Sequence, residues 1–100
     1  FDSCVRKFEA APSAGVKVPH MGWNSVRGLK TGLFDGLQDG SFVYFVHSFA
    51  ADPCEDTIAV SDNGRVFSAA MNKANFYGAQ FHPEKSGEVG EIILRNFMKL

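Results

Sequence analysis

The apolar positions of the chain are grouped into short runs separated by turn residues, and one such run predicts a buried strand. Residues 42–46 read Phe-Val-Tyr-Phe-Val, with Asp39-Gly40 before them and Asp52-Pro53 after them. A continuous apolar run of this length is typical of a strand in a sheet covered by helices. We therefore expect residues 42–46 to form a strand that is buried on both faces.

A second pair of runs predicts a β-hairpin. Residues 57–60 and 65–70 are mainly apolar, and Asp62-Asn63-Gly64 lies between them. Asn-Gly between two apolar runs is the strongest short-range signal for a hairpin. Residues 76–81 predict a further strand, and residues 5–9 a short one near the start of the chain.

The last part of the chain has the period of an amphipathic helix. Ser86 is the expected N-cap, and Glu88 lies in the first turn, where the helix dipole favours acids. Arg95 and Lys99 lie towards the other end, where the dipole favours cations. The apolar face consists of residues at helical spacing, namely Val89, Ile92, Ile93, Phe97 and Leu100.

In chain order these elements are a strand, a connector at residues 11–15, a short helical turn near residues 29–37, four strands and a helix. This order indicates an α/β or α+β fold with a hairpin in the middle. A chain of 100 residues is long enough for one small domain and too short for two. We therefore treat residues 1–100 as part of a single domain.

Composition narrows the possible functions. The formal net charge is −1 and the basic residues are spread along the chain, so no nucleic-acid partner is indicated. The chain has no run of 18 apolar residues, so we expect no membrane partner either. It begins with Phe1 and not Met, which suggests a piece cut from something longer.

The cysteines and histidines do not predict a metal site. Cys4 and Cys54 are the two cysteines, and neither belongs to a Cys-x-x-Cys pair or a Cys/His cluster. They allow one disulfide, but a chain this rich in apolar residues does not need it. A reducing cytoplasm is the better interpretation, and no cofactor is predicted.

The most informative segment for chemistry is Gln80-Phe81-His82-Pro83-Glu84. A residue before proline favours extended backbone, and in extended chain residues i and i+2 point to the same side. His82 and Glu84 should therefore project together from the end of a strand. A carboxylate beside an imidazole fixes its tautomer and frees the other ring nitrogen for a nucleophile. The alternative is a solvated His and Glu at a strand end, which the residues alone leave open.

Four ordered segments resemble class I glutamine amidotransferases, and specifically the glutaminase of imidazole glycerol phosphate synthase. They are QFHPE at 80–84, KVPHMGWN at 17–24, YFVHS at 44–48 and FHPEKSGEVG at 81–90. QFHPE alone is typical of the whole family, whereas the other three favour this one branch. The resemblance implies the C-terminal half of a flavodoxin-like α/β fold, with a mixed sheet, a β-hairpin and a C-terminal helix.

The resemblance also implies catalytic roles for His82 and Glu84, and it shows that the nucleophilic cysteine of the family is missing from this chain. In the family, a His and a Glu at the positions of His82 and Glu84 complete a triad with a cysteine in a Gly-x-Cys-x-Gly turn. No such turn occurs in this chain. We expect the matching enzyme to hydrolyse glutamine and to pass ammonia to a (β/α) barrel synthase (cyclase) subunit, and we expect residues 1–100 alone to be inactive.

The resemblance implies further site residues. Backbone around His47, Ser48 and Phe49 would help to hold glutamine, although a hydrogen-bonded core histidine is the simpler interpretation of residue 47. Trp23 and Asn24, in an expected loop, would lie near the synthase interface; a buried tryptophan is the alternative. The resemblance also places Lys85 at the interface, and the alternative is that Lys85 is simply solvated.

Tyr44 lies in a strand that otherwise looks buried, and its hydroxyl group needs a partner. The resemblance implies that it faces the same interface. For His20 a structural role in a hydrogen-bonded loop is preferred over anion binding or pH sensing.

Two other functions remain open from the sequence. One is the amidotransferase part of an anthranilate, GMP or carbamoyl phosphate synthesising enzyme, against which KVPHMGWN argues. The other is a non-catalytic interaction module that keeps the fold without the nucleophile. Whatever the function, we expect an unprotected sheet edge or apolar face where the missing half should pack, so that residues 1–100 self-associate or are poorly soluble.

Overall fold

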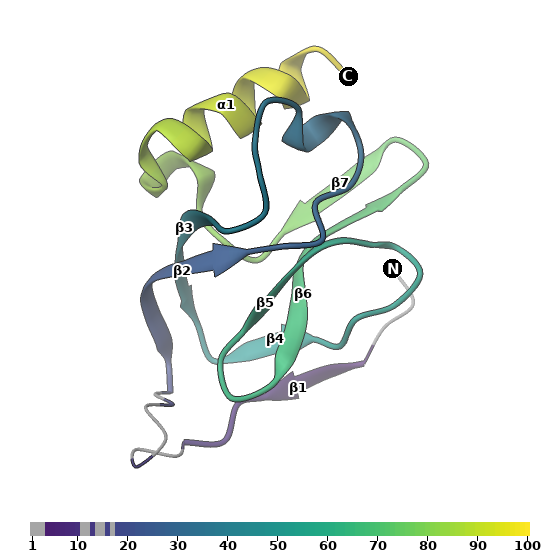
Figure 1. Ribbon diagram of the computed structural model, residues 1–100. Helices are drawn as coiled ribbons and strands as arrows, with labels where there is room; N and C mark the ends of the chain where they lie inside the picture. Colours follow the sequence, from purple (N-terminus) through teal and green to yellow (C-terminus); the bar gives the residue numbers. More distant parts are fainter. Residues whose placement is uncertain (1–3, 11–12, 14–15, 17) are drawn as a thin grey trace.

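The computed structural model describes residues 4–10, 13, 16 and 18–100, and the connector expected at residues 11–15 lies almost entirely outside them. The described elements form three small antiparallel sheets and one α-helix. Figure 1 shows the helix at one end of the molecule and the β1–β4 sheet at the other. This mixture of strands with a C-terminal helix agrees with the expected α/β class, and every described strand pairing is antiparallel.

In the described ranges, the elements include strands, the 3-10 helices η2 and η3, and helix α1. Their bounds are β1 Val5–Lys7, β2 His20–Val26, η2 Gly32–Phe34, β3 Ser41–His47, β4 Phe49–Ala51, β5 Thr57–Asp62, β6 Val66–Lys73, β7 Phe76–Ala79, η3 Pro83–Lys85 and α1 Gly87–Met98. The sheets are β1–β4, β2–β3 and β5–β6–β7.

The predicted hairpin is confirmed as β5 and β6, which pair antiparallel around the Asn63-Gly64 turn. Gly64 has φ +83°, in the left-handed region where a side chain is strained. The helical turn near residues 29–37 is confirmed as η2, and the strand predicted at 76–81 is β7, which ends at Ala79. β4, which is only Phe49–Ala51, was not predicted.

The strand predicted at residues 42–46 exists as β3, but the prediction that both its faces are buried is wrong. Val43 and Phe45 have no solvent exposure, whereas Phe42 and Val46 are exposed. β3 alternates because only one face of the β2–β3 hairpin packs on the described core. That core also contains Val26 from β2, Phe67 from β6, Phe81 after β7 and Ile93 from α1.

Helix α1 confirms the element predicted near the end of the chain, but its apolar stripe is only partly buried. Ile93 is buried, while Phe97 and Leu100 are exposed. Asn96 ties the helix to the η2 region by donating to the carbonyls of Leu33 and Asp35. The helix therefore has an anchored side and an uncovered apolar side in the described part of the chain.

The start of α1 packs so closely on η3 that it has no room for a side chain at residue 90. A Cβ at Gly90 would lie 1.9 Å from the carbonyl oxygen of Pro83 and 2.9 Å from Cβ of Ser86. Both neighbours belong to the turn that follows His82. Gly90 thus determines how near the helix approaches the segment that carries His82 and Glu84.

We expect Gly90→Ala to lower the free energy of unfolding by about 1–3 kcal/mol, because the new methyl group overpacks against backbone. Alanine is the better helix former, so helix propensity alone predicts the opposite sign. Urea denaturation of residues 1–100 measures the change. Gly32→Ala is the matched control, because its Cβ would meet only Leu100 at 3.5 Å. An unchanged or raised stability for Gly90→Ala contradicts the close packing.

Candidate active site

His82 and Glu84 lie side by side where the chain leaves the sheet. His82 has extended backbone, with φ −103° and ψ 99°, and Pro83 begins η3. The Nδ1 atom of His82 is 3.0 Å from Oε1 of Glu84. The geometry predicted from the His-Pro-Glu spacing is therefore present.

This contact determines which nitrogen of the ring is available. A carboxylate only accepts hydrogen bonds, so Nδ1 of His82 carries the hydrogen and Nε2 presents a lone pair when the ring is neutral. The side chains of His82 and Glu84 are 42% and 57% exposed. Nε2 forms no hydrogen bond within the part of the chain that the structure describes. The pair thus has the arrangement of a base and the group that orients it.

Ser86 fastens the His82 segment to β3. Its hydroxyl group donates to the carbonyl of His82 at 2.6 Å and accepts from the amide of Tyr44 at 2.9 Å. The amide of His82 donates in turn to the carbonyl of Tyr44 at 2.9 Å. Ser86 precedes α1 as predicted, but its side chain makes no capping hydrogen bond to the helix. Its hydroxyl group instead fixes the backbone of the candidate base.

The outer face of the β2–β3 hairpin is apolar and uncovered. Trp23 and Tyr44 are opposite one another in register, with ring centroids 5.9 Å apart. Met21 and Val46 form the next pair on this face, and both are exposed. Trp23 is 54% exposed, so the interpretation as a buried tryptophan is wrong. We call Met21, Trp23, Phe42, Tyr44 and Val46 the outer face of the hairpin.

Trp23 and Asn24 lie on β2, and the expectation of a loop there is wrong. Asn24 points to the opposite side from Trp23, because successive residues of a strand alternate. Its amide nitrogen lies 3.2 Å from Nε2 of His20 and 2.8 Å from the carbonyl of Asp62. Asn24 is therefore not brought together with Trp23 and Tyr44, whereas Lys85 is exposed in η3, directly after Glu84.

The residues expected to hold glutamine form the corner between β3 and β4. His47 is the last residue of β3, Ser48 is half-buried and Phe49 is exposed at the start of β4. The side chain of His47 is buried, with its Nε2 2.8 Å from Nδ1 of His20. The expectation of a hydrogen-bonded core histidine is confirmed. Any contact of His47 with a substrate must therefore come from its backbone.

Burial keeps this histidine pair neutral. Burial lowers the pKa of His20 from 6.5 to about 4, and the neighbouring His47 contributes to this lowering. Burial also lowers the pKa of His47, against the hydrogen bond to the carbonyl of Phe49, which raises it; Arg65 and His82 lower it too. A second proton on the pair is thus disfavoured by its surroundings.

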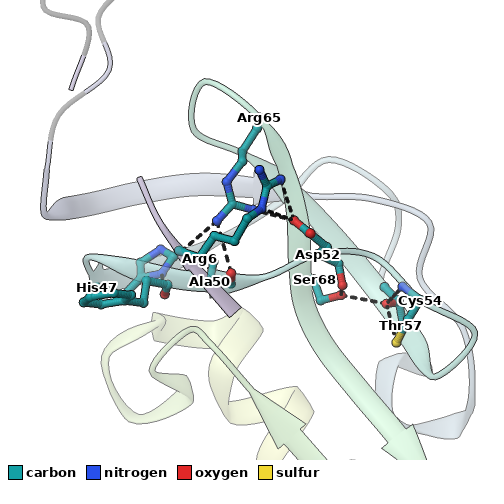
Figure 2. A network of polar contacts seen from close by, with 9 residues as sticks. Arg6, His47, Ala50, Asp52, Cys54, Thr57, Arg65 and Ser68 are labelled. Carbon is teal, nitrogen blue, oxygen red and sulfur yellow. Dashed lines mark hydrogen bonds and ion pairs between the residues drawn. The ribbon is translucent and has the colours of Figure 1, made fainter. Parts of the chain in front are cut away.

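An arginine-centred network holds the strands around this corner (Figure 2). Arg65 donates to the carboxylate of Asp52 at 3.1 Å and to the carbonyls of Arg6 and Ala50. It therefore joins the start of β6 to both β1 and β4. Arg6 also pairs with Asp52, and its hydrogen bond lowers the pKa of that carboxyl group. The sequence did not predict this network, because its members come from separate elements and form no local motif.

The two thiols are not at the candidate site. Cys4 and Cys54 are free, and neither forms a hydrogen bond to His82. Among the described residues no group of three or more His, Cys, Asp or Glu side chains has the arrangement of a metal site. No helix in the described ranges is long and apolar enough to cross a membrane.

Comparison with known proteins identifies the class. The family model for Glutamine amidotransferase class-I matches residues 4–100, and the chain belongs to this family. The crystal structure of a protein assigned to GMP synthase, from Thermoplasma acidophilum, matches with a TM-score of 0.71 and 24% identity. The match covers 98% of this chain and 48% of that one, and it shows the shared fold.

Curated relatives point to one branch of the class. The chain is 53% identical over all 100 residues to imidazole glycerol phosphate synthase subunit HisH of Bacteroides fragilis, and it covers 50% of that protein. It is 49% identical over 94 residues to the protein of the same name from Haemophilus influenzae, 47% of which is covered. The chain thus spans about half the length of the curated relatives it matches.

The neutral histidine pair predicts a loss of stability in mild acid. An unfolded histidine has a pKa near 6.5, so the unfolded chain takes up protons below that pH before the folded chain does. The stabilisation is complete above about pH 6.5 and is lost as the pH falls towards 4. We expect His20 alone to reduce the free energy of unfolding by about 2 kcal/mol between pH 7 and pH 5.

Urea denaturation of residues 1–100 at the two pH values measures this loss. His20→Phe is the comparison variant, and its stability should change less between pH 7 and pH 5. If the free energy of unfolding changed equally between pH 7 and pH 5 in the two proteins, His20 would not be held neutral by the fold. The carboxyl group of Asp52 contributes only at lower pH, because its pKa is lowered and not raised.

Proposed function

We propose that this chain is the base-bearing part of a glutaminase that supplies ammonia to imidazole glycerol phosphate synthase. The observation that carries the proposal is the hydrogen bond between Nδ1 of His82 and Glu84, with Nε2 left open. Membership of the class I glutamine amidotransferase family and about 50% identity to HisH subunits support it. We infer that residues 1–100 are one portion of a single amidotransferase domain that functions in the cytoplasm.

The proposed chemistry needs a cysteine from outside this chain. Its thiolate attacks the side-chain amide carbon of glutamine, and the carbonyl oxygen takes up the negative charge. When the tetrahedral intermediate collapses, the C–N bond breaks and Nε2 of protonated His82 gives its proton to the leaving nitrogen. Ammonia leaves and a thioester remains on the cysteine.

The same histidine then reverses its role. Neutral His82 accepts a proton from water as the water oxygen attacks the thioester carbon. The C–S bond breaks, glutamate leaves and the thiolate is restored with His82 protonated. Throughout, Glu84 holds the Nδ1–H and stabilises the imidazolium form. Backbone of His47, Ser48 and Phe49 is proposed to hold the glutamine.

The outer face of the hairpin is the proposed docking surface for the barrel partner. It is apolar, and its residues are exposed except for Tyr44, which is half-buried. It is continuous with the His82 segment, because the Tyr44 backbone bonds both His82 and Ser86. Aromatic side chains in such patches are frequent anchors of protein interfaces. Lys85, beside Glu84, would contribute a charge at the edge. Ammonia released near His82 would then have a short path to the partner.

We expect glutaminase activity once the chain is joined to the N-terminal half of the Bacteroides fragilis protein. His82→Gln should lower kcat by about 10²–10⁴-fold, the usual contribution of a general acid–base residue. Glu84→Gln should lower kcat less, because the base remains. Enzyme-coupled assay of released glutamate, with the barrel partner present, measures both.

Two controls make this test specific. Glu88→Gln changes an exposed glutamate at the start of α1 and should leave kcat unchanged. Residues 1–100 alone should release no ammonia from glutamine. His82-dependent ammonia release from residues 1–100 alone would disprove the need for an outside cysteine. An inactive joined protein that folds and binds the barrel partner would favour a non-catalytic module.

We expect Trp23→Ala to weaken binding of the joined protein to the barrel partner by at least about tenfold, as for an interface hot spot. Isothermal titration calorimetry measures the Kd. Phe76→Ala is the matched control, because Phe76 is an exposed aromatic residue on β7 and not on the outer face. Equal effects of the two substitutions, or none for Trp23, would place the interface elsewhere.

Sedimentation of residues 1–100 should show self-association that Trp23→Ala reduces.

A further inference from the structure

His20 and His47 form a buried contact that the proposed reaction does not use. His20 is the first residue of β2 and His47 the last of β3, and the two are direct partners in the register. Each is 8% exposed. Nδ1 of His20 lies 2.8 Å from Nε2 of His47. Burying two adjacent imidazoles is unfavourable unless every ring nitrogen has a hydrogen-bond partner.

The partners of the two rings fix where each hydrogen lies. Nδ1 of His47 is 3.1 Å from the carbonyl oxygen of Phe49, which only accepts, so this nitrogen must donate. In the neutral ring Nε2 of His47 then accepts, and Nδ1 of His20 donates to it. Nε2 of His20 accepts in turn from the amide of Asn24. The chain of donors therefore runs from Asn24 through His20 and His47 to the Phe49 carbonyl.

The surroundings support the neutral form of both rings. Phe45 stacks on both rings with centroids 4.9 and 5.2 Å away, and Phe67 lies 5.9 and 5.1 Å from His20 and His47. Phe8 packs edge-on against His47 at 5.1 Å. The charged or titratable groups that lower the pKa of His47 are Arg65 and His82, and His47 lowers the pKa of His20. The carbonyl of Phe49 favours the imidazolium form of His47, but burial outweighs it and the pKa of His47 is lowered.

This series of hydrogen bonds from Asn24 to the Phe49 carbonyl ends on the segment proposed to hold glutamine. Three successive carbonyls there accept hydrogen bonds from three separate parts of the chain. The Ser48 carbonyl accepts from the amide of Phe8, and the Ala50 carbonyl accepts from Arg65. The Phe49 carbonyl between them accepts from His47. Of the three, only the Phe49 bond depends on the tautomer of a side chain.

We propose that His20 is a positioning residue for glutamine binding. By donating to Nε2 of His47 it favours, together with the Phe49 carbonyl, the Nδ1–H tautomer of that ring, and that hydrogen fixes the Phe49 carbonyl and the shape of residues 47–49. This inference rests on the proposed glutaminase function. Without the donor at residue 20, His47 is free to carry its hydrogen on Nε2, and the Phe49 carbonyl loses its partner.

The tautomers can be observed directly in residues 1–100. Long-range ¹H–¹⁵N correlation spectra at pH 7 should show both His20 and His47 neutral with the hydrogen on Nδ1, whereas free histidine prefers Nε2–H. In His20→Phe, the fraction of His47 with its hydrogen on Nε2 should rise, because only the Phe49 carbonyl then favours Nδ1–H. Observation of His47 with its hydrogen on Nε2 in the unsubstituted chain would disprove this series of hydrogen bonds and with it the inference. That result would not depend on the activity of the joined protein.

Kinetics of the joined protein test the positioning role. We expect His20→Phe to raise KM for glutamine about tenfold with kcat changed less than about threefold, because ground-state positioning is lost. His20→Asn keeps a donor at the place of Nδ1 and should stay within about threefold of the original KM. Asn96→Ala removes two hydrogen bonds to the η2 region and controls for lost stability.

The outcomes separate this inference from the proposed function. An active joined protein in which His20→Phe leaves KM unchanged, or in which His20→Asn is as impaired as His20→Phe, disproves the positioning role and leaves the glutaminase intact. A raised KM in Asn96→Ala as well would assign the effect to stability and overturn the inference. A folded joined protein that does not hydrolyse glutamine disproves both.

Discussion

The backbone of Tyr44 is the point on which the arrangement of the site depends. Its carbonyl accepts from the amide of His82, and its amide donates to Ser86, whose hydroxyl group donates back to the His82 carbonyl. These three bonds dock the His-Pro-Glu turn against β3. The turn is also pressed on from the other side by α1, where Gly90 lies against Pro83. The candidate base is thus held by backbone on both sides although its side chain is open to solvent.

β3 also links the base to the two surfaces that the proposed function needs. Outward residues of β3 contribute to the outer face of the hairpin, and its last residue, His47, begins the corner at residues 47–49. Its inward residues, Val43 and Phe45, are in the core. One strand therefore carries the proposed partner surface, the attachment of the base and the proposed substrate segment. A shift of register in β3 would displace all three together.

Local sequence was sufficient to predict the elements and contacts whose causes are local. The Asn63-Gly64 turn, the C-terminal helix and the His82–Glu84 contact each follow from neighbouring residues. β2 could not be predicted in this way, because its alternation is reversed. Met21 and Trp23 point outward, while His20 and Asn24 point towards the interior, where their polar groups bond one another. Asn24 is separated from Trp23 because the two are successive residues of this strand.

The remaining differences come from long-range contacts. His20 and His47 are 27 residues apart and meet only because of the register of the hairpin. Arg65 reaches Asp52 and two carbonyls from separate strands, which no local spacing indicates. The prediction of a doubly buried β3 was wrong for a similar reason, since the run Phe-Val-Tyr-Phe-Val does not tell which of its faces the rest of the chain covers. The outer face is apolar and yet uncovered in the described residues.

The central claim is that His82 is the base of a cysteine-dependent glutaminase, and the reactivity of the cysteine tests it most directly. A thiol paired with an imidazole has a lowered pKa. In the protein joined to the nucleophile-bearing half, the rate of alkylation of that cysteine by iodoacetamide should be measured against pH. We predict that the pKa of this cysteine lies well below the usual value of about 8.5, and that it returns to that value in His82→Gln. An alkylation profile that is the same with and without His82 would contradict the account.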